Sequence, residues 1–267
     1  MSSAAQAAAQ WTADLASWAI PKEILDQAAV APWTHPVARF VVPDGPIPDS
    51  PSHSTARAAL PTGGSVLDIG CGGGRAAMAL VPPASHVTGV DHQQGMLDAF
   101  ADAALRAGVG SAGYLGDWPD IADVVPEADV VVCHHVLFNV PQLEPFLAAL
   151  DGHARRRIVI EIPLRHPLSW LNPLWERFWG LQRPSAPHAR DALAIARGLG
   201  YDAQMIEFSE PAGRMPLQPH ERAADTCMRL CLPESRIDEV TAALEEMYAD
   251  TGEPPRELAT IWWDVHR

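Results

Sequence analysis

Residues 66–75 read VLDIGCGGGR, and this stretch decides the fold class. An apolar run interrupted only by Asp68 leads into a turn in which four of five residues are glycine, and a helical segment follows from Arg75. Glycine lets the backbone turn sharply and approach a ligand closely. The N-terminus of the helix that follows presents backbone N–H groups to the same ligand. The stretch therefore predicts a strand, a ligand-binding turn and a helix at the carboxyl edge of an open α/β sheet.

The spacing of the glycines discriminates among nucleotide-binding loops. A dinucleotide site has the pattern GxGxxG, whereas Gly70, Gly72 and Gly74 follow GxGxG and Arg75 occupies the third dinucleotide position. A phosphate-binding loop of the GxxxxGK[ST] type needs a lysine, which this loop lacks. An NAD-dependent oxidoreductase is therefore the less favoured alternative.

Short apolar runs alternate with helical segments on both sides of this loop. We expect strands at 65–69, 86–90, 112–115, 129–134 and 157–162, with helices at 75–81, 95–107 and 141–150 between them. Further along, we expect a helix at 188–199, strands at 202–208 and 226–232, a helix at 234–249 and a last strand at 258–263. Alternation of β and α units with apolar strands predicts a mostly parallel sheet covered on both faces.

Two segments do not follow this alternation. Residues 1–60 contain short helical patterns and the proline-rich stretch 43–51, so they predict a helical N-terminal extension ahead of a main domain at 61–267. Residues 164–186 are rich in Trp and Pro and predict an insertion after the fifth strand. We expect both segments to form a lid over the carboxyl edge of the sheet.

Carboxylates follow the next two strands. Asp91 ends the second strand, where an acid can accept both ribose hydroxyls of a nucleoside. Asp117 follows the third strand, where it can accept a hydrogen bond from an adenine amino group, and Trp118 can pack on the base. The glycine turn and the two acids, at three successive strand ends, together predict a nucleoside site.

In residues 66–74, 87–91, 116–117 and 130–140 the chain resembles the class I S-adenosylmethionine-dependent methyltransferases, in particular the broad group of small-molecule methyltransferase domains. The resemblance covers residues 62–163 well and 188–232 by element order only. It implies a Rossmann-like, doubly wound, mostly parallel seven-stranded sheet with an antiparallel last strand. It also implies S-adenosylmethionine as the cofactor and S-adenosylhomocysteine as the product.

The resemblance implies a cofactor-binding role for a set of residues along these strand ends. For the methionine end they are Asp68, Gly70, Cys71, Gly72 and Gly74; for the ribose and adenosine, Asp91, His92 and Met96; and for the adenine, Gly116, Asp117 and Trp118. His134, after the fourth strand, is expected near the methionine moiety.

Three histidines are candidates for a general base, because imidazole titrates near neutral pH. They are His134, His135 and His166; the alternative interpretation is that they contact the cofactor or are packed, hydrogen-bonded histidines. Glu161 lies inside an apolar strand, which favours a paired structural carboxylate over a catalytic acid. No metal-binding motif is present in the sequence, and we predict no metal site.

The composition and net charge limit the classes of molecule that the protein is expected to bind. The chain has 267 residues, 48% of them hydrophobic, and a formal net charge of −14, which argues against a general nucleic-acid binder. We therefore expect a small-molecule acceptor, with a protein or RNA acceptor less favoured and a non-catalytic cofactor-binding protein as the alternative.

The four cysteines show no CxxC spacing, and there is neither a signal peptide nor an apolar run that could span a membrane, so we expect a soluble, cytoplasmic protein. The acceptor and the oligomeric state are not specified by the sequence.

Overall fold

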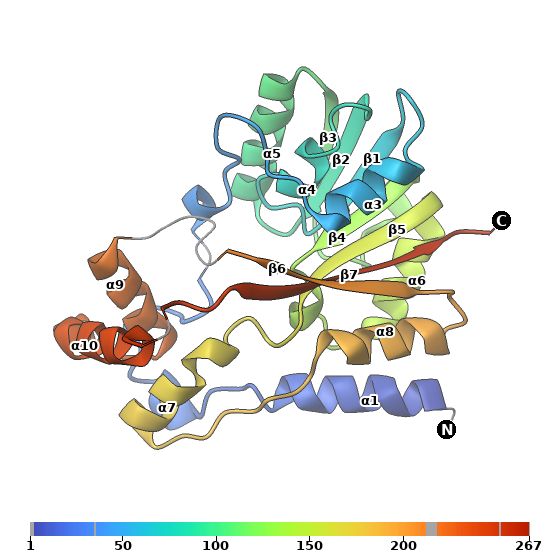
Figure 1. Cartoon of the computed structure of the whole chain (residues 1–267). Helices are drawn as coiled ribbons and strands as arrows, with labels where there is room; N and C mark the ends of the chain where they lie inside the picture. Colours follow the sequence, from blue (N-terminus) through green and yellow to red (C-terminus); the bar gives the residue numbers. More distant parts are fainter. Residues whose placement is uncertain (1–2, 35, 212–217, 251, 267) are drawn as a thin grey trace.

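The computed structural model describes residues 3–34, 36–211, 218–250 and 252–266, and its centre is a seven-stranded sheet with the order β3-β2-β1-β4-β5-β7-β6 (Figure 1). The strands are β1 (Ser65–Ile69), β2 (His86–Asp91), β3 (Gly110–Leu115), β4 (Ala128–His134), β5 (Ala154–Pro163), β6 (Gln204–Glu210) and β7 (Arg256–Asp264). Strands β1 to β5 pair in parallel, and β7 runs antiparallel to both β5 and β6. The predicted doubly wound, mostly parallel sheet is confirmed.

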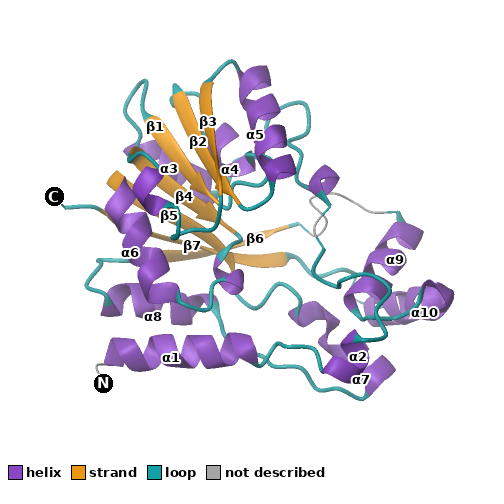
Figure 2. Ribbon diagram, turned by 180° about the vertical axis from the view of Figure 1, so that it is seen from behind, coloured by secondary structure: helices purple, strands orange, loops and turns teal. Residues whose placement is uncertain are grey.

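Helices cover both faces of the sheet, which is why the central strands are apolar at successive positions. On one face α6 (Leu143–His153) and α8 (Ala189–Gly198) pack on the sheet, and α1 (Ser3–Ala16) packs against α8 and α6 (Figure 2). On the other face lie α3 (Pro51–Ala59), α4 (Arg75–Met78) and α5 (Gln94–Ala107). Strand β4 shows the alternation directly, because Val131 and Cys133 face the α6 layer while Val130 and Val132 face the α4 layer.

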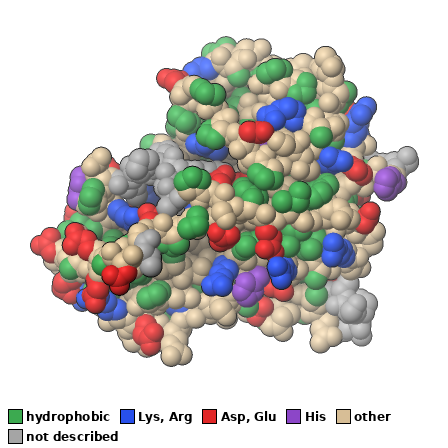
Figure 3. All heavy atoms as spheres, in the orientation of Figure 1, with side chains coloured by type: hydrophobic (Ala, Val, Ile, Leu, Met, Phe, Trp, Pro, Cys, Tyr) green, Lys and Arg blue, Asp and Glu red, His purple; other side chains and the backbone are tan. Residues whose placement is uncertain are grey.

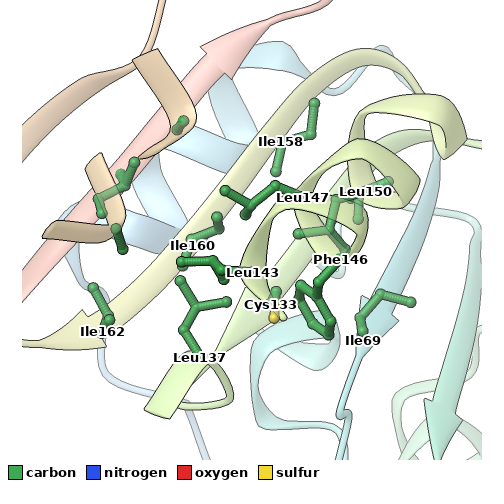
Figure 4. Packing of buried hydrophobic residues seen from close by; sticks show 14 of the residues in the cluster. Ile69, Cys133, Leu137, Leu143, Phe146, Leu147, Leu150, Ile158, Ile160 and Ile162 are labelled. Carbon is green, nitrogen blue, oxygen red and sulfur yellow. The ribbon is translucent and has the colours of Figure 1, made fainter. Parts of the chain in front are cut away.

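The core between α6 and the sheet holds the strand ends in place. Figure 4 shows leucines and Phe146 of α6 directed at Cys133 of β4 and at the isoleucines of β5. Phe146 is 2% exposed and Cys133 is fully buried. Burying a side chain of this size contributes about 2 kcal/mol, so the carboxyl ends of β1, β4 and β5 form a rigid platform.

A separate apolar cluster lies beyond the carboxyl edge of the sheet. It is built by α2 (Lys22–Leu25), α7 (Asn172–Trp179), α9 (Pro219–Arg229) and α10 (Ile237–Tyr248), which we call the helical cap. Helix α7 follows the carboxyl end of β5, and α9 and α10 join β6 to β7 at the same edge. Segments 1–60 and 164–186 both contribute to this cap, and the lid role predicted for them stays a prediction.

The strand predicted at 226–232 is wrong, because this segment forms the end of α9 and the turn after it. A capping box between Gln218 and Glu221 and a proline at the first turn start the helix. Ala223, Cys227 and Leu230 are then buried at helical spacing against the cap. A short, mostly apolar segment has the same composition in a buried helix and in a buried strand, so its period could not be read from the segment alone.

The state of the cysteines and the character of the helices can also be read from the structure. All four cysteines are buried, and none forms a disulfide. Across the described residues, no helix combines the length and the apolar character that crossing a bilayer requires.

Candidate functional site

The glycine loop connects β1 to α4 in a conformation that only glycine adopts easily. Gly70, Gly72 and Gly74 have φ values of +67°, +49° and +92°. A Cβ atom at Gly70 would collide with Val136, and one at Gly74 would lie 2.8 Å from the ring of Phe100. Because the backbone N–H of Gly70 also donates to the carbonyl of Val90 at 2.9 Å, the loop is closed onto the end of β2. The loop is therefore a preformed backbone cradle.

Asp91 ends β2 and closes this cradle. Its Oδ2 accepts a hydrogen bond from Gly72 N at 3.0 Å, and its Oδ1 accepts one from Gln93 N at 3.0 Å. The side chain is 8% exposed, and each carboxylate oxygen has a second lone pair for a ligand hydroxyl. The structure brings the loop and Asp91 together as expected, and the ribose role of Asp91 stays a prediction. Met96 is buried nearby on α5, whereas His92 is exposed.

Asp68 lies under the loop, 1% exposed, with Oδ2 accepting a hydrogen bond from Ala77 N at 3.2 Å. Burial and, to a smaller extent, the negative charge of Asp91 raise the pKa of Asp68 to about 7 against the opposing effect of the Ala77 N–H. Burial also raises the pKa of the adjacent Cys71 thiol, which therefore stays protonated. Two carboxyl groups beside the loop favour a ligand that carries positive charge.

The residues predicted to hold the adenine are Gly116, Asp117 and Trp118, and they follow β3. Gly116 N donates to the Asp91 carbonyl at 3.0 Å, which ties the end of β3 to the end of β2, and Asp117 is exposed there. Trp118 packs edge-to-face on His153, with ring centroids 4.7 Å apart. His153 is the last residue of α6, at the amino edge of the sheet. The Trp118 ring thus packs on the end of α6, and its packing on adenine stays a prediction.

A cluster of polar side chains lies where β4 and β5 end. Glu161 is fully buried; its Oε1 lies 2.9 Å from Nε2 of His135 and 3.9 Å from Nδ1 of His134. From the N-terminal extension, the Ser50 hydroxyl donates to Glu161 Oε2 at 3.3 Å, and the His53 ring stacks on His134 with centroids 5.7 Å apart. We call these five residues the His–Glu cluster.

Sequence reasoning missed Ser50 and His53. They sit at the start of α3, where Ser50 caps the helix by accepting a hydrogen bond from His53 N. This capping pattern was readable in the sequence, but the docking of α3 on β4, β5 and β7 was not. Only the tertiary structure therefore shows that these two residues belong to the cluster.

His166 does not join the cluster. Its ring stacks on Trp18 at 3.8 Å and meets Phe138 edge-on at 5.3 Å. Burial and, to a smaller extent, the nearby Arg183 charge lower the pKa of His166 to about 4. The imidazole is therefore neutral at physiological pH and lines a mostly apolar hollow of about 360 Å³ between the end of α1 and the segment after β4. Its role as a base stays a prediction.

Residues 37–42 of the N-terminal extension cover the glycine loop. A Cβ atom at Gly72 would lie 3.5 Å from the Phe40 ring, and one at Gly73 would collide with the Phe40 carbonyl. Arg39 pairs with Asp225 of α9 at 2.5 Å. The segment therefore connects the glycine loop to the helical cap.

Comparison with known proteins agrees with this geometry. The family model described as "Methyltransferase domain" matches residues 66–156. The chain is 35% identical over 94 residues to a ubiquinone biosynthesis O-methyltransferase of Hahella chejuensis, covering 35% of this chain and 39% of that protein. It is 27% identical over 161 residues to a protein of the same name from Chromobacterium violaceum, covering 52% of this chain and 69% of that protein.

The chain spans about two fifths of the length of the first curated relatives that it matches. Among solved structures, the YcgJ protein of Bacillus subtilis superposes with a TM-score of 0.54 at 16% identity, over 81% of this chain and 98% of that one. At this identity the likeness supports the fold, and the family model supports the chemistry of the glycine loop.

Proposed function

With residues 66–156 assigned to the class I S-adenosylmethionine-dependent methyltransferases, we propose that this protein transfers the methyl group of that cofactor to a small-molecule acceptor. One observation carries the proposal: the glycine loop after β1 is closed onto the Asp91 carboxylate at the end of β2. A backbone cradle beside an acid at the second strand end suits the amino acid and ribose parts of one nucleoside ligand.

The residues present fit S-adenosylmethionine. Asp91 suits the ribose hydroxyls, and buried Asp68 suits the cationic part of the ligand. When bound, the cofactor supplies a methyl group on a sulfonium that an acceptor atom displaces in line. The chain's own contribution is to orient donor and acceptor and to exclude water from the carboxyl edge.

Three observations support a small acceptor. The helical cap lies beyond the carboxyl edge and Phe40 lies against the glycine loop, and we expect a lid formed by these segments to leave less room for a macromolecule than an open edge would. The net charge of −14 disfavours a nucleic-acid acceptor, and Figure 3 shows acidic side chains over the end of the molecule where α9 and α10 lie. The relatives from Hahella chejuensis and Chromobacterium violaceum are named ubiquinone biosynthesis O-methyltransferases.

Calorimetry with the purified chain tests the cofactor. We expect S-adenosylmethionine and S-adenosylhomocysteine to bind and NADH not to bind. Asp91→Asn should weaken both cofactor forms, while Asp102→Asn, an exposed position on α5, should leave them unchanged. Binding of NADH alone, or no binding of either cofactor form, would contradict the proposal. Formation of S-adenosylhomocysteine with pooled hydroxyl or amine compounds then tests transfer and the acceptor class.

A further inference from the structure

We propose that the hollow at the end of α1 binds the acceptor, and that the acceptor is an aromatic compound whose carbonyl-type oxygen accepts a hydrogen bond from His166. We call this space the α1 hollow; it is lined within residues 12–19, within residues 138–141 and by His166. The inference rests on the proposed function, because it places the acceptor of that reaction. It adds the chemical class of the acceptor, which that function leaves open.

The α1 hollow lies at the carboxyl edge of the sheet, close to the glycine loop. The strand order places β4 beside β1 and β5 beside β4, and the hollow is lined by residues that follow β4 and β5. Val136 packs against Gly70 of the loop, and Phe138, two residues further on, lines the hollow. The hollow is thus one strand along from the loop, on the edge where open α/β sheets bind their ligands.

Hydrogen bonds between α1 and the segment after β4 hold the hollow open. Trp11 Nε1 donates to the Val140 carbonyl at 2.8 Å, and Thr12 Oγ1 donates to the Pro141 carbonyl at 2.7 Å. The Trp11 ring also stacks on Phe138, with centroids 5.7 Å apart. Because α1 is fixed along α8 as well (Figure 2), both walls of the hollow are in place before a ligand binds.

Aromatic rings form much of the wall of the hollow. The Trp18 ring stacks on His166 with centroids 3.8 Å apart, and Phe138 meets His166 edge-on at 5.3 Å. The volume of about 360 Å³ lies within the range of about 300–1,000 Å³ that is usual for small-molecule sites. Aromatic rings attract another ring through offset stacking or edge-to-face contact. The walls therefore favour a planar aromatic ligand.

The hydrogen bonding of His166 selects one tautomer. Its Nδ1 accepts a hydrogen bond from Leu168 N at 3.3 Å, so the neutral ring carries its proton on Nε2. Burial and, to a smaller extent, the Arg183 charge lower the pKa of His166 to about 4, which keeps the ring neutral. Within the described part of the chain no atom accepts a hydrogen bond from Nε2, and this nitrogen is accessible. His166 is therefore an N–H donor without a free lone pair, and this role replaces the general-base role expected from the sequence.

The charges around this donor favour an uncharged oxygen with partial negative charge. The Arg183 guanidinium lies 5.5 Å from the centroid of the Trp18 ring, and its two terminal nitrogens donate to the carbonyls of Trp18 and Ala19. Its charge attracts a polarised oxygen, while its terminal nitrogens are already engaged by the backbone. A carboxylate would lose its hydration among apolar walls for a single neutral donor, which is costly. A carbonyl oxygen conjugated with the ring meets these conditions.

Histidine NMR on the wild-type chain tests the donor. With the histidines labelled with ¹⁵N, His166 should appear as the neutral Nε2–H tautomer at neutral pH, and its signal is assigned by its loss in His166→Phe. The Nδ1–H tautomer, or a charged ring at this pH, would overturn the proposal.

Two phenols of similar size test the chemistry that the hollow recognises. 4′-Hydroxyacetophenone carries a carbonyl group on its ring, whereas 4-ethylphenol lacks one. Chemical-shift titrations give the affinity of each for the wild type and for His166→Phe, which keeps a ring beside Trp18 and removes the donor. The ratio of the two affinities should shift about fivefold against the ketone in the variant, as for loss of one neutral hydrogen bond. An unchanged ratio would overturn the role of His166, because a histidine that only packs would affect both phenols alike.

A matched pair of variants on α1 tests the place of binding. Ala13 and Ala16 are both exposed, but only Ala16 lines the hollow. Ala16→Phe fills the hollow and should abolish binding of 4′-hydroxyacetophenone, whereas Ala13→Phe should bind it as the wild type does. Equal binding by the two variants, or no binding by the wild type, would overturn the proposal.

A last measurement separates this inference from the proposed function. With S-adenosylhomocysteine and 4′-hydroxyacetophenone bound together, an interligand nuclear Overhauser effect should connect the ketone with the methylene protons beside the sulfur. Binding of both without this effect would overturn the acceptor role and leave the proposed function standing. Absence of cofactor binding would contradict the proposed function and the acceptor role with it, while the comparison of Ala16→Phe with Ala13→Phe would still show whether the hollow binds the ketone.

Discussion

Asp68→Asn should stabilise the cofactor-free protein, and the gain should grow with pH. The carboxyl group is 1% exposed and its pKa is raised from 3.8 to about 7, mainly by burial. A raised folded-state pKa contributes stability that is fully present below the unfolded pKa and is lost as pH rises through the folded pKa. The loss approaches about 4 kcal/mol above pH 7, taking about 1.4 kcal/mol for each pKa unit.

Asparagine cannot ionise, and its Oδ1 can still accept the hydrogen bond from Ala77 N. The advantage of Asp68→Asn should therefore be about 2 kcal/mol at pH 5 and about 4 kcal/mol at pH 8. Urea unfolding at a series of pH values between 5 and 8 measures this difference, with Asp102→Asn on the exposed face of α5 as the control. An advantage that does not change with pH would refute the raised pKa of Asp68.

The same substitution should cost cofactor affinity. S-adenosylmethionine carries one more positive charge than S-adenosylhomocysteine, so its binding should favour ionised Asp68. Relative to Asp68→Asn, the wild type should bind it about tenfold more tightly at pH 8 than at pH 6, the change in ionised fraction of a group with a pKa of about 7. The α-amino group of the cofactor titrates in this range as well, so the difference between the two proteins is the quantity to compare.

Three further substitutions test the cradle. Asp91→Asn should weaken binding of S-adenosylhomocysteine by about 2 kcal/mol, as for loss of a charged hydrogen-bond partner, and calorimetry that finds no loss relative to Asp102→Asn would contradict the ribose role. Gly70→Ala should destabilise the fold more than Gly108→Ala, because both have a φ of +67° but only Gly70 has a neighbour in the way; equal shifts in urea midpoint would disprove the collision. Phe40→Ala should speed release of S-adenosylhomocysteine in stopped-flow measurements, and an unchanged rate would mean that residues 37–42 do not cover the bound cofactor.

The fold was predictable wherever the signal was local and repeated. Five apolar runs separated by helical segments indicated a parallel sheet, and each run became a strand between β1 and β5. The segment at 226–232 was mistaken because its apolar run has no decisive period, and only packing against the helical cap made it helical. Likewise, the cap itself was not foreseen as one cluster, because its members come from three distant parts of the chain.

Some features of the candidate site were likewise predictable from the sequence, and others were not. By itself the sequence determined the cradle and its acid, because glycine spacing and a carboxylate at the end of a strand are set by neighbours along the chain. Only the tertiary structure decided that Ser50 meets Glu161 and His53 stacks on His134, that His135 turns toward β5, and that Trp118 packs on His153. The physical reason is that backbone conformation depends largely on neighbouring residues in the chain. The partner of a buried polar side chain depends instead on which elements pack together. Because an unpaired buried polar group is costly, hydrogen bonding makes that choice of partner energetically decisive.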